Sequence, residues 1–375
     1  MSVPPPSPYD PWVGLQDPAF KVAVDAGDWA AARVSLEAFP ADRLIAAFAC
    51  LKDVEEAEVW LEKALADDPA DFVAKTALAA RYIVVGWTIR SSRRAENVSR
   101  EQFEQFHGWL TSAEELLTEV CAEHPDYAPA WHYRLVTARG LQLGQAEARR
   151  RYDKLAAIAA HHFDAQGAYL QQIVPKWGGS WEMAEEFAAE CREAAPLGSP
   201  SRALLLDVLI ERWMDNSVRP DVTRLPEIAA ETVGHPDHQE SAWGAAVHSQ
   251  LAMLYSLAAR PKLAAPHFQA LDAVPSRDGW SYLQEGSYER SRESAFDPHA
   301  SDDPHRTVAI GNLVLLLPLF VVCALVALGS AAMTVLYGIQ KGDFAGTAGW
   351  AAVAAVAGLL SWLSFRPVRR NWHNL

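Results

Sequence analysis

The sequence predicts an all-α protein in two parts, a helical-repeat body and a C-terminal two-helix transmembrane hairpin. Three observations predict this fold class: a long uncharged window near the C-terminus, an alanine-centred repeat before it, and a scarcity of alternating strand patterns. The charged residues divide at the same point. Of 33 Lys and Arg and 47 Asp and Glu residues, only five follow Arg306, namely Lys341, Asp343, Arg366, Arg369 and Arg370.

The body is strongly acidic. The whole chain of 375 residues has a net charge of −14, and its apolar tail contributes four cations and one anion, so the body carries about −17. Such a surface repels polyanions, and we expect no nucleic-acid partner. The four cysteines have no CxxC spacing, which favours a reduced compartment over a disulfide framework or a zinc ribbon. They are Cys50, Cys121, Cys191 and Cys323.

Residues 1–16 form a proline-rich N-terminus that we expect to be disordered, with a polyproline ligand as the alternative. The segment has no basic stretch followed by an apolar one, so it does not resemble an export signal. We therefore expect the body to stay in the cytoplasm.

Residues 17–283 repeat a pattern typical of tetratricopeptide (TPR) units, which place Ala early in the second helix and a larger residue four positions later. Successive alanines lie 35 and 36 residues apart, close to the roughly 34-residue repeat. The pattern occurs at Ala57 with Leu61, Ala113 with Leu117, Ala148 with Tyr152, Ala184 with Ala188 and Ala264 with Phe268. The longer step after Ala184 leaves room for a degenerate unit around 224–246. Glycine turns before Trp29 and Trp181 predict the starts of second helices.

One segment breaks the period. Ala57 and Ala113 are 56 residues apart, and the excess falls in 87–110. Ser99 followed by Gln102 predicts a capping box and a new helix near Arg100.

Four arginines stand in this segment of an otherwise acidic chain: Arg90, Arg93, Arg94 and Arg100. They are either solvated, ion-paired side chains or a patch that reads carboxylate groups of an acidic protein or peptide. The same two readings apply to the basic run at 149–151. Among possible ligands of such a patch, the body's negative charge favours an acidic protein over anionic lipid.

Three stretches resemble a bacterial family of TPR-like proteins classed as a domain of unknown function. They are RYIVVGWTIRSSRRAENVSREQF, TARGLQLGQAEARRRYDKL and PKWGGSWEMAEEFAAE, within 28–213. The segment that begins at Trp177 is the most specific. The resemblance implies a helical repeat in a bacterial cell and brings no catalytic residues; the membrane hairpin is an addition to it. We include Trp177 with the four arginines as candidate partner-binding residues.

Motifs for phosphate loops, dinucleotide binding, α/β-hydrolases and zincins are absent from the sequence, and we expect no cofactor. One cluster resembles a metal site: His235 and His238, with Glu240 and His248 nearby. A metal-dependent or other hydrolytic enzyme that uses this region is therefore the alternative to a non-enzymatic scaffold. Pro236 favours a simple polar turn there.

The chain closes with a membrane module. Residues 284–306 are predicted as a polar linker, 307–340 and 344–365 as membrane spans, and 366–375 as a basic cytoplasmic tail. Trp350 and Trp362 stand near the ends of the second span, as interfacial aromatics do. The functional prediction is a scaffold at the bacterial inner membrane that binds a protein or peptide.

The hairpin orientation is testable. Arg306, Arg366, Arg369 and Arg370 flank the spans on one side, against Lys341 in the turn, so both ends should face the cytoplasm. A reporter that is active only outside the cytoplasm, fused after Ser301 or Leu375, should give no signal. An active reporter at either point would contradict the hairpin or its orientation.

Overall fold

The computed structural model describes residues 17–39, 41–51, 54–91, 98–273 and 276–302, together with Leu15, Ala332 and Leu336. Within these residues the protein is all α, with short 3₁₀ turns and no strand. The predicted span 307–340 other than Ala332 and Leu336, the predicted span 344–365, the tail 366–375 and the predicted N-terminal segment other than Leu15 lie outside them. The chain forms two compact units, 1–258 with 264–291 and 259–263 with 292–375.

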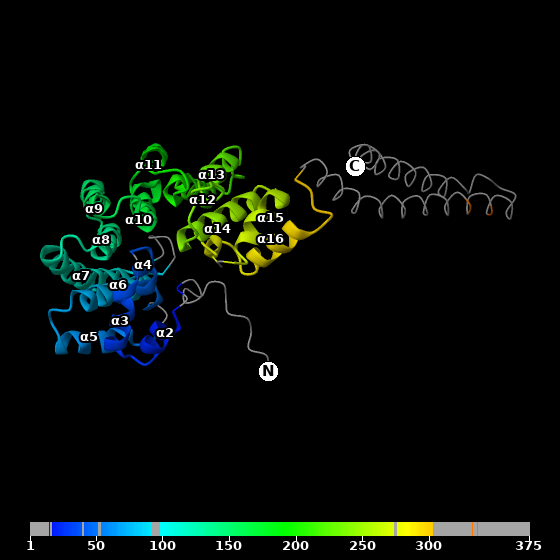
Figure 1. Cartoon of the computed structure of the whole chain (residues 1–375). Coiled ribbons are helices and arrows are strands. Elements are labelled where there is room, and N and C mark those ends of the chain that lie inside the picture. Colours follow the sequence, from blue (N-terminus) through cyan, green and yellow to red (C-terminus); the bar gives the residue numbers. More distant parts are fainter. Residues whose placement is uncertain are drawn as a thin grey trace. The chain divides into compact units, whose positions relative to one another are not determined.

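Helices of the first unit follow one another in chain order (Figure 1). They are α2 (Pro18–Asp25), α3 (Trp29–Ala38), α4 (Ala41–Cys50), α5 (Ala57–Asp67), α6 (Phe72–Arg90), α7 (Arg100–Glu123), α8 (Ala128–Gly140), α9 (Gln145–Ile158), α10 (Phe163–Ile173), α11 (Trp181–Ala194), α12 (Leu205–Asn216), α13 (Leu225–Glu231) and α14 (Ala242–Leu257). Three 3₁₀ turns, η3 (Pro175–Trp177), η4 (Pro200–Ala203) and η5 (Trp280–Tyr282), lie between or after them. Two helices, α15 (Pro261–Ala270) and α16 (Ser287–Phe296), extend across the boundary of the two units.

Helices that are neighbours in the chain pack against one another. Contacts join α2 to α3, α5 to α6, α6 to α7, α8 to α9 and α10 to α11. The even-numbered helices also contact one another, α4 with α6, α6 with α8, α8 with α10, and α12 with α14. In addition α4 touches α8 and α14, so it covers part of the face that the even-numbered helices form.

The repeat positions read from the sequence are core positions. The five alanines Ala57, Ala113, Ala148, Ala184 and Ala264 have no exposed surface. The residue four positions later is buried in every case, from Leu61 to Phe268. Their burial fits the repeat pattern, in which a small side chain is needed where neighbouring helices approach closely.

Helix starts follow the predicted signals. Asp28 caps α3 through the Ala31 N–H at 3.0 Å, and Ser180 caps α11 through the Met183 N–H at 3.2 Å. The capping box at Ser99 is confirmed, since both of its hydrogen bonds are formed with Gln102. The extra residues of this unit lengthen its helices, as α6 has 19 residues and α7 has 24.

Two findings bear on the predicted membrane module. The segment predicted as a polar linker contains α16, where Ala295 is buried. Among the described residues one helix, α6, is long and apolar enough to cross a membrane, and half of that stretch is buried within the protein. Because α6 packs against α5, α7 and α8, this helix has the position of a core helix.

A buried ion network ties α7, α8 and α9 together. The Glu114 carboxylate accepts from Arg134 Nη2 at 2.7 Å and from Arg151 Nη2 at 2.8 Å. Thr137 also donates to it. The Arg151 side chain is only 3% exposed. Burial alone would raise the pKa of Glu114, but the Arg151 charge and these hydrogen bonds outweigh it and lower that pKa.

Removing Arg151 should therefore destabilise the protein strongly. We expect Arg151→Ala to lower the free energy of unfolding by about 3–5 kcal/mol, because it leaves the Glu114 carboxylate buried with fewer donors. The neighbouring Arg150, whose side chain is 49% exposed in its pair with Glu147, is the matched control. Arg150→Ala should cost about 0–1 kcal/mol. Denaturant unfolding followed by tryptophan fluorescence measures both, and equal effects would contradict the structural role of the network.

Candidate functional site

The predicted arginine segment divides in the structure. Arg100 is 91% exposed on its side chain and pairs with Glu104 one turn along α7. Arg93 and Arg94 lie outside the described residues. Arg90 is half-buried at the end of α6, where it turns toward aromatic rings. The four arginines therefore do not share one environment.

Arg90 and Trp177, two of the predicted residues, meet in one cluster. The Arg90 guanidinium lies 5.5 Å from the Trp87 ring centroid and 5.8 Å from that of Trp177. Arg139 makes the same pair of contacts, at 5.5 and 5.7 Å. The two indole rings meet edge to face at 5.8 Å. We call these four half-buried residues, Trp87, Arg90, Arg139 and Trp177, the Arg–Trp cluster.

Three separate segments position the cluster. Trp87 and Arg90 are three residues apart on α6 and therefore share a face of that helix. Arg139 stands at the end of α8, where it donates to the Ala168 carbonyl at 3.4 Å. Trp177 closes η3, and Gln145 Nε2 donates to its carbonyl oxygen at 3.2 Å.

The turn after Trp177 depends on glycine. A Cβ on Gly179 would lie 1.8 Å from the Ile173 carbonyl oxygen, so no other residue fits there. This close approach holds η3 against the end of α10. The Trp177-Gly178-Gly179 segment, which the sequence singled out, is thus the element that brings Trp177 to Arg90.

Both guanidiniums of the cluster are partly desolvated. Burial lowers the pKa of Arg139 to about 10, although Tyr282 and Glu211 oppose the shift. Burial also lowers the pKa of Arg90. Both side chains remain charged at neutral pH. Two cations stacked on indole faces form a surface suited to carboxylate groups, which arginine binds through two parallel hydrogen bonds.

A group of carboxylates lies on the elements that follow. Asp207 and Glu211 are one turn apart on α12, and Asp278 precedes η5. Gln250 Nε2 on α14 donates to Asp207 at 2.9 Å and to Asp278 at 2.7 Å. Glu211 is 4% exposed and accepts from Lys176 Nζ at 2.7 Å and Gln171 Nε2 at 2.6 Å. We call Asp207, Glu211 and Asp278 the acidic cluster.

Desolvation and mutual repulsion mark this cluster. Burial and the charges of Asp278 and Glu211 raise the pKa of Asp207 well above its usual value. Desolvation also raises the pKa of Asp278. Tyr282 is half-exposed; burial and the charges of Glu211, Asp278 and Asp207 raise the pKa of its hydroxyl to about 12, and the charge of Arg139 opposes the shift.

Sequence reasoning missed Arg139 and the acidic cluster. The spacing of Asp207 and Glu211 could have predicted that the two carboxylates are neighbours, since residues four apart share a helix face. Nothing in the sequence connects these residues to Gln250 or Asp278. The second basic run is fully engaged in ion pairs: Arg149 with Asp153 and Glu190, Arg150 with Glu147, and Arg151 with Glu114 and Glu147.

The histidines of the predicted alternative site make separate hydrogen bonds. His238 Nδ1 lies 2.9 Å from the Gly198 carbonyl oxygen, and His235 Nδ1 accepts from the Asp237 N–H at 3.2 Å. His248 instead pairs with His267, Nδ1 to Nδ1 at 3.0 Å. In the part of the chain that the structure describes, no group of three or more His, Cys, Asp or Glu residues is placed to hold a metal.

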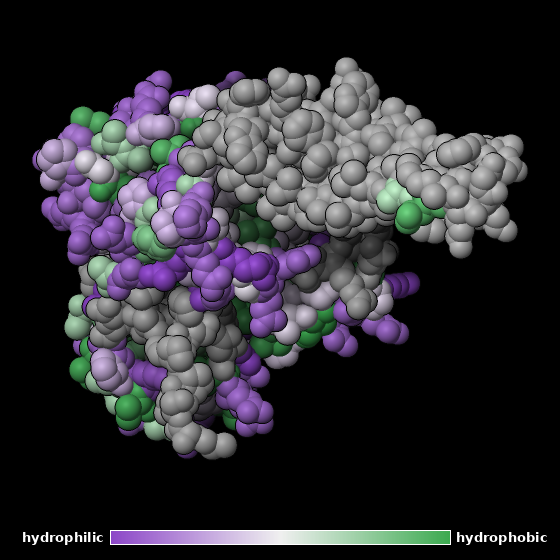
Figure 2. Space-filling view, turned by 90° about the vertical axis from the view of Figure 1, so that its right-hand side faces the viewer, coloured by the Kyte–Doolittle hydropathy of each residue, from purple (hydrophilic) through white to green (hydrophobic). Residues whose placement is uncertain are grey.

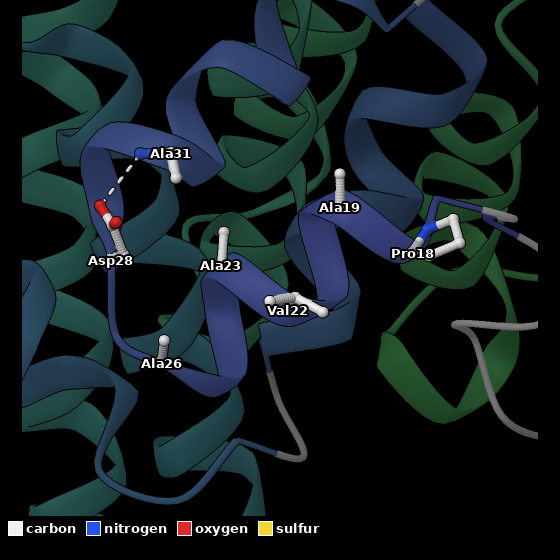
Figure 3. A pocket seen from close by; sticks show the side chains of 7 residues that line it. All are labelled: Pro18, Ala19, Val22, Ala23, Ala26, Asp28 and Ala31. Atoms are coloured by element: carbon white, nitrogen blue, oxygen red, sulfur yellow. Dashed lines mark hydrogen bonds between the residues drawn. The ribbon is translucent and has the colours of Figure 1, made fainter.

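Two surface pockets carry less chemistry than the clusters. Figure 3 shows the larger, about 480 Å³, which α2 and α3 line with small apolar side chains. Its one charged residue, Asp28, is occupied in capping α3. The second, about 290 Å³, lies among α11, η4, α12 and α13, where Arg192 and Arg202 are bound to Glu231. Hydrophilic residues dominate the coloured surface in Figure 2, and hydrophobic ones appear as scattered spots.

The buried histidines predict acid sensitivity. Burial lowers the pKa of His132 and His267 to about 3 and that of His162 and His248 to about 4. A histidine whose folded pKa lies below its unfolded value contributes stability above pH 6.5 that is lost as the pH falls toward the folded pKa. Each contributes up to about 1.4 kcal/mol per pH unit, while Asp207 and Asp278 act in the opposite direction.

The test compares the wild type with His162→Asn. Asparagine retains an acceptor for the N-cap of α10, which His162 Nδ1 now supplies to the Ala165 N–H, but it does not titrate. We measure the free energy of unfolding from pH 7 to 5. Its decline with falling pH should be shallower in this variant than in the wild type by up to about 1.4 kcal/mol per pH unit, which corresponds to one proton. Curves of equal slope for the two proteins would show that His162 does not take up a proton on unfolding, and would contradict the prediction.

We find no protein-family model, no curated protein and no solved structure that matches the chain. The resemblance to a bacterial TPR-like family therefore stays a prediction. What the protein binds has to follow from the chemistry of its own clusters.

Proposed function

We propose that the chain is a TPR-like helical-repeat scaffold, anchored to the bacterial inner membrane by its C-terminal hairpin, that binds an acidic protein or peptide in the cytoplasm. The observation that carries this proposal is the Arg–Trp cluster. It presents two desolvated guanidiniums and two indole faces on the side of the body formed by α6, α8 and η3.

The repeat reading is supported by the alternation of first and second helices from α2 to α15 and by the five buried alanines. Stacked helix pairs supply rigid side-chain positions over a long face, and repeat proteins commonly bind partners there. The membrane reading is supported by the uncharged window 307–340 and the apolar run 344–365 of the sequence.

Arginine and tryptophan are the residues on which binding energy concentrates at protein interfaces. In the cluster each guanidinium is held over two rings, so little side-chain entropy is left to lose on binding. Most arginines elsewhere in the described part of the body serve internal ion pairs, as Arg151 does with Glu114. The Arg139 guanidinium has no carboxylate bonded to it among the described residues and is thus available for one.

Partner capture tests the proposal. The tagged full chain, extracted in mild detergent, should recover a specific protein, and Arg139→Gln should reduce its recovery about tenfold or more. Arg149→Gln is the matched control, because Arg149 also stacks on two rings, Tyr152 and Tyr169, but already pairs with Glu190. Equal loss in both variants, or no partner at all, would contradict the proposal. Elemental analysis of the same preparation checks the metal-dependent form of the enzyme alternative, which requires a stoichiometric metal.

A further inference from the structure

The chain that leads toward the predicted first span is tied to the start of α15. The Asp302 carboxylate accepts from the backbone N–H of Lys262 at 2.8 Å and from that of Leu263 at 3.1 Å. The carbonyl oxygen of Asp302 accepts from the Arg260 guanidinium. We call the contacts of Asp302 with Arg260, Lys262 and Leu263 the Asp302 clamp. All four residues belong to the second compact unit, 259–263 with 292–375.

The clamp supplies a helix cap that the local sequence lacks. The first N–H groups of a helix have no partner within it, and a short polar side chain just before the helix usually accepts from them. Arg260 stands at that position before Pro261, and its side chain has no acceptor. Asp302 accepts instead, and the helix dipole favours a carboxylate there. The clamp therefore stabilises α15 and fixes Asp302 at the same time.

Few residues separate the clamp from the predicted membrane hairpin. The first span is predicted to begin at residue 307, so only the four residues 303–306 precede it after Asp302. Five residue steps cover at most about 17 Å even when the chain is fully extended. With the hairpin in the bilayer, the start of α15 lies within that distance of the beginning of the span.

Two large apolar side chains are exposed beside the clamp. Leu263 on α15 is 43% exposed, and Phe296, the last residue of α16, is 45% exposed. The Arg292 guanidinium lies 5.2 Å from the Phe296 ring centroid. Lys262 Nζ donates to the carbonyl oxygen of Asp297, the residue after Phe296. We call Lys262, Leu263, Arg292 and Phe296 the juxtamembrane surface. Apolar side chains flanked by basic ones are typical of surfaces that lie in the membrane interface.

We propose that the juxtamembrane surface lies on the cytoplasmic face of the bilayer, with Leu263 and Phe296 among the lipid headgroups. The proposal rests on the proposed function, because it requires the hairpin, and it adds a second contact between the protein and lipid. The charged ends of Lys262 and Arg292 remain at the level of the phosphates, as long basic side chains do at a membrane interface.

Position and charge favour lipid as the occupant of this surface. Position favours it because the covalent chain keeps the surface within reach of the bilayer. The charges of Lys262 and Arg292 are balanced by Glu293 and Asp297, which are exposed on the same segment. Attraction to anionic lipid is therefore weak, and the apolar side chains carry the contact. Added salt should not release the juxtamembrane surface from the bilayer.

Fluorescence quenching in vesicles tests the proposal. The full chain is placed in vesicles of phosphatidylethanolamine and phosphatidylglycerol, in a Cys323→Ala background whose other three cysteines are buried. A fluorescent probe is attached at Leu263→Cys or at Phe296→Cys in separate preparations. Lipids with a nitroxide on the headgroup should reduce the fluorescence at both positions about twofold or more, at low and at high salt.

Ser294→Cys is the matched control for the probe position. Ser294 is exposed on α16 like Phe296, but residues two apart do not share a helix face. A probe there should lose little fluorescence.

Asp302→Ala tests the clamp. It removes both acceptors at the start of α15, so quenching at the Leu263→Cys and Phe296→Cys probes should fall toward the level of the control probe. Glu293→Ala removes the same charge from α16 and should leave the quenching unchanged. Unchanged quenching in Asp302→Ala would overturn the role of the clamp in positioning this surface.

A probe at Ala332→Cys, within the predicted first span, separates the inference from the proposed function. The hairpin requires that nitroxides on the lipid acyl chains quench this probe. If they do, and the probes at Leu263→Cys and Phe296→Cys lose no more fluorescence than the one at Ser294→Cys, the inference is overturned and the anchor stands. Absence of quenching at Ala332→Cys would overturn the membrane anchor of the proposed function, and the inference with it.

Discussion

The burial of small side chains among packed helices is the constraint on which the rest of the body depends. Helices can approach closely where a side chain is small, and the five alanines at the repeat positions, from Ala57 to Ala264, have no exposed surface. The residue four positions after each of these alanines is buried as well, from Leu61 to Phe268. Even-numbered helices also contact one another, as α6 contacts α8 and α8 contacts α10, and these contacts bring distant parts of the sequence together.

Arginines in this body either form internal ion pairs or remain without a bonded carboxylate. The extent of burial alone does not distinguish the two kinds. Arg151 is almost fully buried and ties three helices together through Glu114. Arg139 is half-buried, yet it stacks on Trp87 and Trp177 and has no carboxylate bonded to it in the described part of the chain. A guanidinium whose charge is satisfied internally stabilises the fold. One that is desolvated and still lacks a counter-charge is available to a ligand, because a ligand that supplies the missing carboxylate gains most from it.

Local signals in the sequence were read correctly where the physics is local. The capping box at Ser99 and the helix starts at Trp29 and Trp181 each depend on residues within four positions, and the structure confirms them. Arg90 and Trp177 were both singled out, but their contact was not, since 87 residues separate them. Arg139 carried no such signal. The helix in the predicted linker, α16, was missed because its sequence is polar, with an apolar contact at Ala295 that only packing reveals.

The sequence by itself determined the all-α class, the repeat positions and the uncharged C-terminal window, because periodicity, caps and hydropathy are properties of neighbouring residues. Only the tertiary structure decided which charges meet. Asp207, Gln250 and Asp278 come from α12, α14 and the turn before η5, and Arg139 joins Trp177 through a glycine that allows η3 to approach Ile173. Whether a charged side chain is paired, stacked or left unpaired depends on the atoms around it, and those atoms come from helices that are far apart in the chain.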